Sequence, residues 1–215
     1  MTGSSVKDIH LRNAIAAERQ ELAEVLNALP TQLWDTQSLC ARWRVREVVA
    51  HMTMPFRYST QRFVVEVVKA RGSFNRMADR CARQDAELQI DELVASLRDN
   101  TENPWKPPGG GFEGALAHDV IHGLDITMAL QLGRKVPEDR LRMVLDVVTR
   151  PKSIKFFGTD LNGIELRADD IEWSFGSGTP VFGSAQDLAL VISGRKLPAG
   201  LLQGAASRRF AHITQ

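Results

Sequence analysis

The sequence predicts a mainly α-helical protein, in which four principal helices form a bundle and a small α+β portion follows. Two observations lead to this fold class. Apolar residues recur at helical spacing through most of the first 150 residues. After Pro151 the pattern changes to short alternating runs separated by polar turns, which is typical of strands. We therefore expect two domains, residues 1–150 and residues 151–215.

The boundaries of the expected helices follow from proline and glycine. Pro55 falls inside the second apolar run and should either kink that helix or divide it into two. The stretch "NTENPWKPPGGG" is a loop, and Gly133 stands just past the end of the next apolar run. The four principal helices are expected over residues 7–29, 45–70, 74–98 in one or two pieces, and 112–132, and a short fifth helix over 137–150.

The second domain begins with a predicted hairpin. In "NGIELRADDIEWSFG" alternating apolar residues flank a polar Ala-Asp-Asp turn, which indicates two antiparallel strands. The segment "GSAQDLALVISGR" predicts a short helix with Ser184 as its cap.

Composition and charge exclude several classes of protein. The net charge of +1 leaves no basic surface for nucleic acid. No run approaches the ~18 apolar residues of a membrane span, and the N-terminus lacks the apolar core of a signal peptide, so we expect a cytoplasmic protein. Cys40 and Cys81 are too few for a disulfide framework and form no CxxC pair. Cys40 is either a small buried residue, which we favour, or a lone nucleophile.

The stretch "AHDVIHGLDI" indicates a possible metal site. His118 and His122 share one helical face with β-carbons ~6 Å apart, so both imidazoles can reach one metal ion. Asp125 lies on the same stripe and can accept a hydrogen bond from the outer nitrogen of a ligand histidine. Such a pair is by default surface or core, but His51 lies in the apolar run "REVVAHMTMP" of another central helix and offers a third ligand. Three neutral imidazoles leave an open position, as in catalytic zinc sites.

Three motifs, in order, resemble one family. The stretch "LCARWRVREVVAHM" resembles the C-x-G-W-x-V-x-x-x-x-x-H signature of the mycothiol-dependent maleylpyruvate isomerase family, a branch of the DinB-like metal-binding helical bundles. "HDVIHGLDI" is similar to its second metal motif, and "FGSAQDLALVISGR" to its C-terminal segment. Arg42 departs from the pattern where the family often has glycine, and His118 replaces a glutamate found in many members.

The resemblance implies a DinB-like four-helix bundle in which His51, His118 and His122 hold a divalent metal, usually zinc. It also implies mycothiol as thiol cosubstrate. The leading hypothesis is a thiol-dependent transferase or isomerase: the metal lowers the pKa of the thiol, whose sulfur attacks a small electrophile or adds to a cis double bond, permits rotation and leaves. Arg195 either binds a substrate carboxylate or is a solvated surface residue.

Two other functions remain open on the same scaffold. A zinc-water hydrolase needs a general base, for which Asp125 is the motif candidate. A non-catalytic metal-binding module needs no general base. Trp43 and Trp105 are expected to pack rather than to bind substrate, and His10 and His212 to be exposed. The expected partners are a small electrophile and a low-molecular-weight thiol, without nucleic acid or membrane, and a homodimer is left open.

Overall fold

The computed structural model describes residues 3–212, and it is mainly helical with a small sheet near the C-terminus, as the sequence predicts. The chain divides into two compact units, one ending at Leu130 and the other beginning at Gln131. The sequence places this division at 150 instead. In the structure α7 (Glu138–Val148) packs against α9 (Ala185–Ile192), so this helix lies with the C-terminal elements. No helix in the described part of the chain combines the length and apolar character that crossing a bilayer requires.

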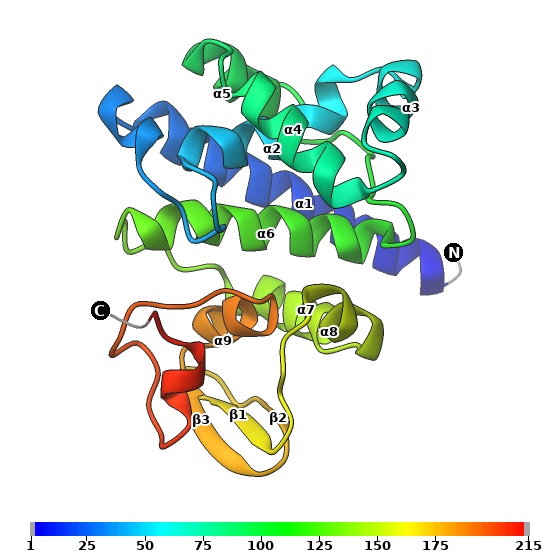
Figure 1. Cartoon of the computed structure of the whole chain (residues 1–215). Coiled ribbons are helices and arrows are strands. Elements are labelled where there is room, and N and C mark those ends of the chain that lie inside the picture. Colours follow the sequence, from blue (N-terminus) through cyan, green and yellow to red (C-terminus); the bar gives the residue numbers. More distant parts are fainter. Residues whose placement is uncertain (1–2, 213–215) are drawn as a thin grey trace. The chain divides into compact units, whose positions relative to one another are not determined.

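The first unit, as far as its residues are described, is built from helices (Figure 1). Its long helices coincide with the apolar runs of the sequence, because each buries one stripe against its neighbours. Its elements are α1 (Gly3–Asn27), the 3₁₀ helix η1 (Thr31–Asp35), α2 (Val45–Arg57), α3 (Thr60–Lys69), α4 (Phe74–Asp85), α5 (Ile90–Arg98) and α6 (Gly111–Ala129).

The run predicted as one helix over 45–70 is divided into α2 and α3. Pro55 stays within the last turn of α2, and the chain turns into extended backbone at Tyr58 and Ser59. The Ser59 hydroxyl then accepts a hydrogen bond from the backbone N–H of Arg62 and caps α3. Of the two alternatives for Pro55, division of the helix is therefore the one observed, a short distance beyond the proline.

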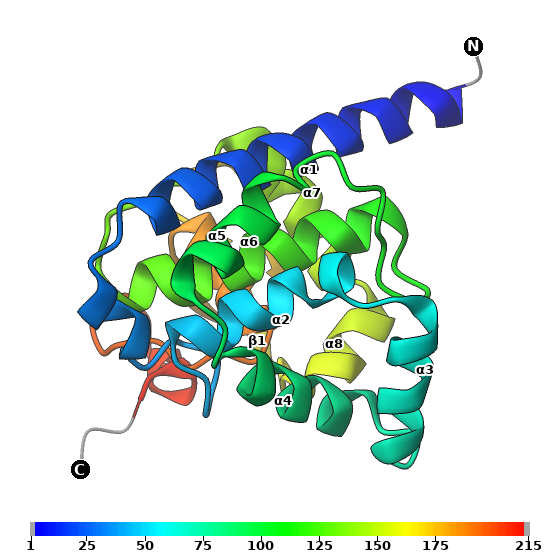
Figure 2. The same ribbon diagram turned by 90° about the horizontal axis from the view of Figure 1, so that it is seen from above.

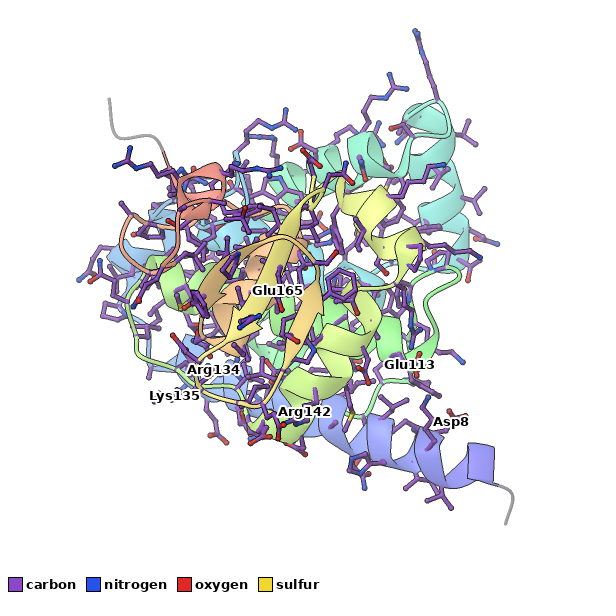
Figure 3. All side chains as sticks on the ribbon, turned by 90° about the horizontal axis from the view of Figure 1, so that it is seen from below. Asp8, Glu113, Arg134, Lys135, Arg142 and Glu165 are labelled. Atoms are coloured by element: carbon purple, nitrogen blue, oxygen red, sulfur yellow. The ribbon has the colours of Figure 1, made fainter. Side chains whose placement is uncertain are left out.

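The core of the first unit forms where α2 meets its neighbours. This helix packs against α4, α5 and α6, while α1 packs against α5 and α6. Figure 2 shows α1, α6, α2 and α4 following one another across the unit. Figure 3 shows Asp8 on α1 close to Glu113 in the first turn of α6, where Lys7 pairs with Glu113 at 2.6 Å. This packing places the middle of α2 beside the middle of α6.

The second unit combines three helices with a three-stranded sheet. The predicted hairpin is present: β1 (Ile164–Ala168) pairs antiparallel with β2 (Ser174–Gly176). A third strand, β3 (Thr179–Gly183), pairs parallel with β1 and was not predicted, nor was the short helix α8 (Pro151–Phe157). The Ser184 hydroxyl accepts from the Asp187 N–H and caps α9, as predicted. A 3₁₀ turn, η2 (Ser207–Phe210), follows.

Candidate metal centre

Helices α2 and α6 bring together the three histidines that the sequence singles out. His51 comes from the middle of α2, and His118 and His122 lie one turn apart on α6. One potential ligand atom from each lies within 4.8 Å of the other two. The Nε2 atoms of His51 and His118 are 3.2 Å apart. The triad is largely withdrawn from solvent: His51 is 7% exposed, and the side chains of the other two are 14% and 12% exposed.

Two carboxylates orient the histidines of α6. The Nδ1 atom of His122 lies 3.0 Å from Oδ2 of Asp125, the contact that the helical spacing predicts. The Nδ1 atom of His118 lies 2.8 Å from Oδ1 of Asp119. A carboxylate at Nδ1 favours the tautomer that carries its proton there and leaves the Nε2 lone pair free for a metal. The two rings are thus prepared to bind through Nε2.

Asp119 is itself held by a buried arginine. The Nε of Arg19, on α1, donates to Oδ2 of Asp119 at 2.7 Å, and both side chains are almost fully buried. Burial raises the pKa of the Asp119 carboxyl, but the hydrogen bond with His118 and the charge of Arg19 outweigh burial and hold this pKa below its ordinary value. Asp119 therefore stands as a carboxylate beside His118.

Sequence reasoning missed both Arg19 and Asp119. A charged residue in an amphipathic helix normally faces solvent, so nothing local marks Arg19 as buried. Asp119 adjoins His118 in sequence, and that adjacency was the available signal.

Two tryptophans form walls of the centre. The Trp43 ring centroid lies 4.9 Å from that of His51 and 6.2 Å from that of His122, and its indole N–H donates to Oδ1 of Asp79 at 3.0 Å. Trp105 meets His118 edge to face at 5.1 Å. Both residues pack, as expected, but they pack against the candidate ligands.

The turn that delivers Trp43 explains one departure from the family pattern. Arg42 adopts left-handed backbone with φ of 69°. This conformation costs a non-glycine residue about 1–2 kcal/mol, which is why glycine suits the position. The Arg42 carbonyl accepts a hydrogen bond from Arg83 of α4, and the turn keeps its geometry without the glycine.

One separation within the triad agrees with a metal ion shared by two imidazoles. Two nitrogens bound to zinc at about 2.0–2.1 Å are about 3.3–3.4 Å apart. The 3.2 Å between the Nε2 atoms of His51 and His118 is close to that separation. Cys40, His122 and Asp125 form a second group with potential ligand atoms within 4.8 Å. Since Asp125 contacts Nδ1 of His122, its carboxylate faces the outer side of that ring.

Comparison with known proteins gives a family match to part of the helical unit. Residues 15–104 match the profile of the mycothiol maleylpyruvate isomerase N-terminal domain. Over these residues the chain is similar to that domain. The family resemblance predicted from the three motifs is therefore confirmed. His51 lies within the matched residues, and His118 and His122 follow after them.

Two solved structures share the fold over most of the chain. The crystal structure of the mycothiol-dependent maleylpyruvate isomerase matches with a TM-score of 0.58 at 13% identity, over 94% of this chain and 92% of that chain. A histidine-to-alanine mutant of the same enzyme matches with a TM-score of 0.58 at 12% identity, over the same shares. At this identity the likeness shows the fold. The comparison with curated proteins gives no match.

The remaining predicted residues lie outside the triad. Arg195 follows α9 in the second unit, where its Nη1 donates to the Ser193 carbonyl at 2.6 Å, and its role towards a substrate carboxylate stays a prediction. His10 and His212 are exposed, as expected.

Proposed function

We propose that this protein is a divalent-metal enzyme that uses a low-molecular-weight thiol, such as mycothiol, in a transferase or isomerase reaction on a small electrophilic molecule. The observation that carries the proposal is the convergence of three histidine side chains from α2 and α6, two of them with a carboxylate at the outer nitrogen. His51, His118 and His122 would hold the metal, with zinc as the first choice for three imidazoles. When bound, zinc would lower the pKa of an incoming thiol and favour its thiolate.

The chain's own residues prepare the centre for this chemistry. Asp119 and Asp125 hold the two α6 imidazoles by Nδ1, so that Nε2 can be presented to the metal. Trp43 and Trp105 cover the ring faces and edges with apolar surface, which limits the access of water and strengthens electrostatic interactions inside the site.

The thiol hypothesis is favoured over a zinc-water hydrolase by the position of Asp125. A hydrolase needs a base near the open metal position. Asp125, the residue predicted for that role, instead contacts the outer nitrogen of His122. Its carboxylate is thus placed to orient a ligand.

The decisive experiment is the visible spectrum of the cobalt(II)-substituted protein, titrated with mycothiol. We expect a tetrahedral cobalt spectrum that gains a sulfur-to-metal charge-transfer band. His118→Ala should abolish cobalt binding, whereas His10→Ala, a matched change at an exposed histidine of α1, should leave it intact. A spectrum indifferent to thiol would contradict the thiol reaction, and turnover of esters or amides without thiol would then indicate a hydrolase. Full cobalt occupancy in His118→Ala would contradict the site.

A further inference from the structure

We infer that Arg19 is a positioning residue of the metal centre, which orients His118 through two routes that meet at one guanidinium. The inference rests on the proposed metal function and gives one residue of α1 a role in it. One route passes through Asp119, and the other through the loop that carries Trp105.

The first route fixes the tautomer of His118. Oδ1 of Asp119 lies 2.8 Å from Nδ1 of His118, and Oδ2 of Asp119 accepts a hydrogen bond from Nε of Arg19 at 2.7 Å. Each carboxylate oxygen thus faces a different partner. With Arg19 holding one oxygen, the other points at Nδ1, so the Nε2 lone pair of His118 turns towards His51.

The second route fixes the face of the same ring. Nη1 of Arg19 donates to the carbonyl of Asn103 at 2.9 Å, and also to the carbonyls of Asn100 and Thr101 at 3.2 and 3.3 Å. The Asn103 side chain in turn accepts the Trp105 backbone N–H at 3.0 Å. Trp105 then meets His118 at 5.1 Å. Arg19 is therefore connected to His118 twice, once through Asp119 and once through Asn103 and Trp105.

Arg19 also touches the helix that supplies the remaining histidine. Its guanidinium carbon lies 4.9 Å from the ring centroid of Phe56, on α2. One buried cation therefore contacts α2, α6 and the loop between α5 and α6, the segments that surround the triad.

The energetics favour a positioning role over a purely structural one. A buried ion pair is weak grounds for stability, because desolvation of the two charges offsets their attraction and apolar residues of similar volume often serve as well. The fork of an arginine, however, can hold a carboxylate and several carbonyls in one fixed geometry, which an apolar side chain cannot do. Geometry is therefore what this pair contributes.

Asp119→Asn tests the first route with little change of shape. The amide has one acceptor oxygen, but Asp119 serves two donors, so the amide nitrogen must face either Arg19 or His118. We expect the zinc affinity to fall about 10- to 100-fold. We also expect ¹⁵N NMR of the metal-free protein to show His118 shifting from protonated Nδ1 towards protonated Nε2, a change that a loss of packing alone would not produce.

Two further variants complete the test. Arg19→Met fills the space without the fork and should weaken zinc binding; because it leaves the Asp119 carboxylate buried without its partner, it should also lower the stability of the fold. Asn103→Ala removes the acceptor of the Trp105 N–H, together with a hydrogen bond from the Asn103 amide to the Asn100 side chain. Because it disturbs no buried charge, it should alter the His118 resonances while the fold persists. Asp85→Asn is the matched control, because Asp85 of α4 forms an ion pair of low exposure with Arg57 and belongs to neither route. It should leave zinc affinity and the tautomer unchanged.

The outcomes separate this inference from the metal function. If the wild type binds no zinc, the metal function fails, while the tautomer measurements still test the two routes. If Asp119→Asn and Asn103→Ala keep wild-type zinc affinity and wild-type His118 resonances, the positioning role of Arg19 is overturned. Equal effects in Asp85→Asn would also overturn it, since they would reflect general stability.

Discussion

At the scale of the residue, Glu47 shows how a single carboxylate supports the helix that carries His51. It lies in the first turn of α2 with a side chain only 4% exposed. Its carboxylate accepts from the backbone N–H of Arg44 at 2.7 Å and pairs with the Arg44 guanidinium. Burial raises the pKa of Glu47, but the hydrogen bonds from Arg44 outweigh burial and hold this pKa below its ordinary value.

Glu47→Gln should therefore reduce stability, and the loss should depend on pH. A carboxyl with a lowered pKa in the folded state contributes stability above its unfolded pKa and loses that contribution as pH falls through its folded pKa. We expect a loss of about 1–2 kcal/mol near neutral pH, because a charged hydrogen bond at the helix start is weakened. Urea denaturation from pH 7 to pH 3 should show the wild type and variant converging at acid pH. A constant difference across that range would contradict the assignment.

The residues of the candidate site could be predicted to different extents. His118, His122 and Asp125 follow from helical spacing alone, because residues three and four apart share one face. His51 required the inference that two apolar helices pack together. The contact of Arg19 with Asp119 spans 100 positions of sequence, and no local pattern encodes which two charged residues meet inside a core.

At the scale of the element, the connection between β2 and β3 requires glycine at Gly178. Gly178 has φ of 129°, and a β-carbon there would lie 2.2 Å from the carbonyl oxygen of Gly163. Gly158, at the end of α8, also has positive φ, at 69°, but a β-carbon there would meet no atom within 4 Å. The two positions share an unfavourable φ and differ in available space.

Gly178→Ala and Gly158→Ala form a matched pair for this connection. Gly158→Ala should cost about 1–2 kcal/mol, the penalty of a left-handed residue. Gly178→Ala should cost more, by about 1–3 kcal/mol, because the backbone of the connection must also move. Denaturation followed by circular dichroism measures both, and equal losses would show that the contact with Gly163 carries no constraint.

The elements were predicted where a local signal exists. The long helices, the hairpin and the cap at Ser184 follow from periodicity and turn chemistry. The strand Thr179–Gly183 was missed because it contains proline and pairs in parallel with β1, so that no hairpin turn marks the pairing. The end of α2 was misplaced because the break depends on the cap at Ser59 rather than on Pro55 alone.

At the scale of the whole molecule, a metal held between α2 and α6 should couple binding to folding. The unfolded chain does not hold the three imidazoles together, so a bound ion stabilises the folded state. The coupling joins helices that are far apart in sequence, since His51 and His118 lie on either side of α3, α4 and α5.

Zinc should accordingly raise the unfolding temperature. At a free zinc concentration of 100 times Kd the expected gain is about 2.7 kcal/mol. Calorimetry with and without zinc measures it, and His122→Ala should lose most of the gain. An equal rise in His122→Ala would show that zinc acts elsewhere on the chain.

The contacts of Trp43 and Trp105 with the triad give the molecule an optical reporter. The chain has four tryptophans; Trp34 is fully buried in the core, and Trp173 lies in the second unit. The ring centroids of Trp43 and Trp105 lie 4.9 and 5.1 Å from those of His51 and His118, respectively. A paramagnetic ion such as cobalt(II) bound there would quench the emission of these two. Ultraviolet emission alone can therefore follow occupancy of the centre, without a label and without knowledge of the substrate.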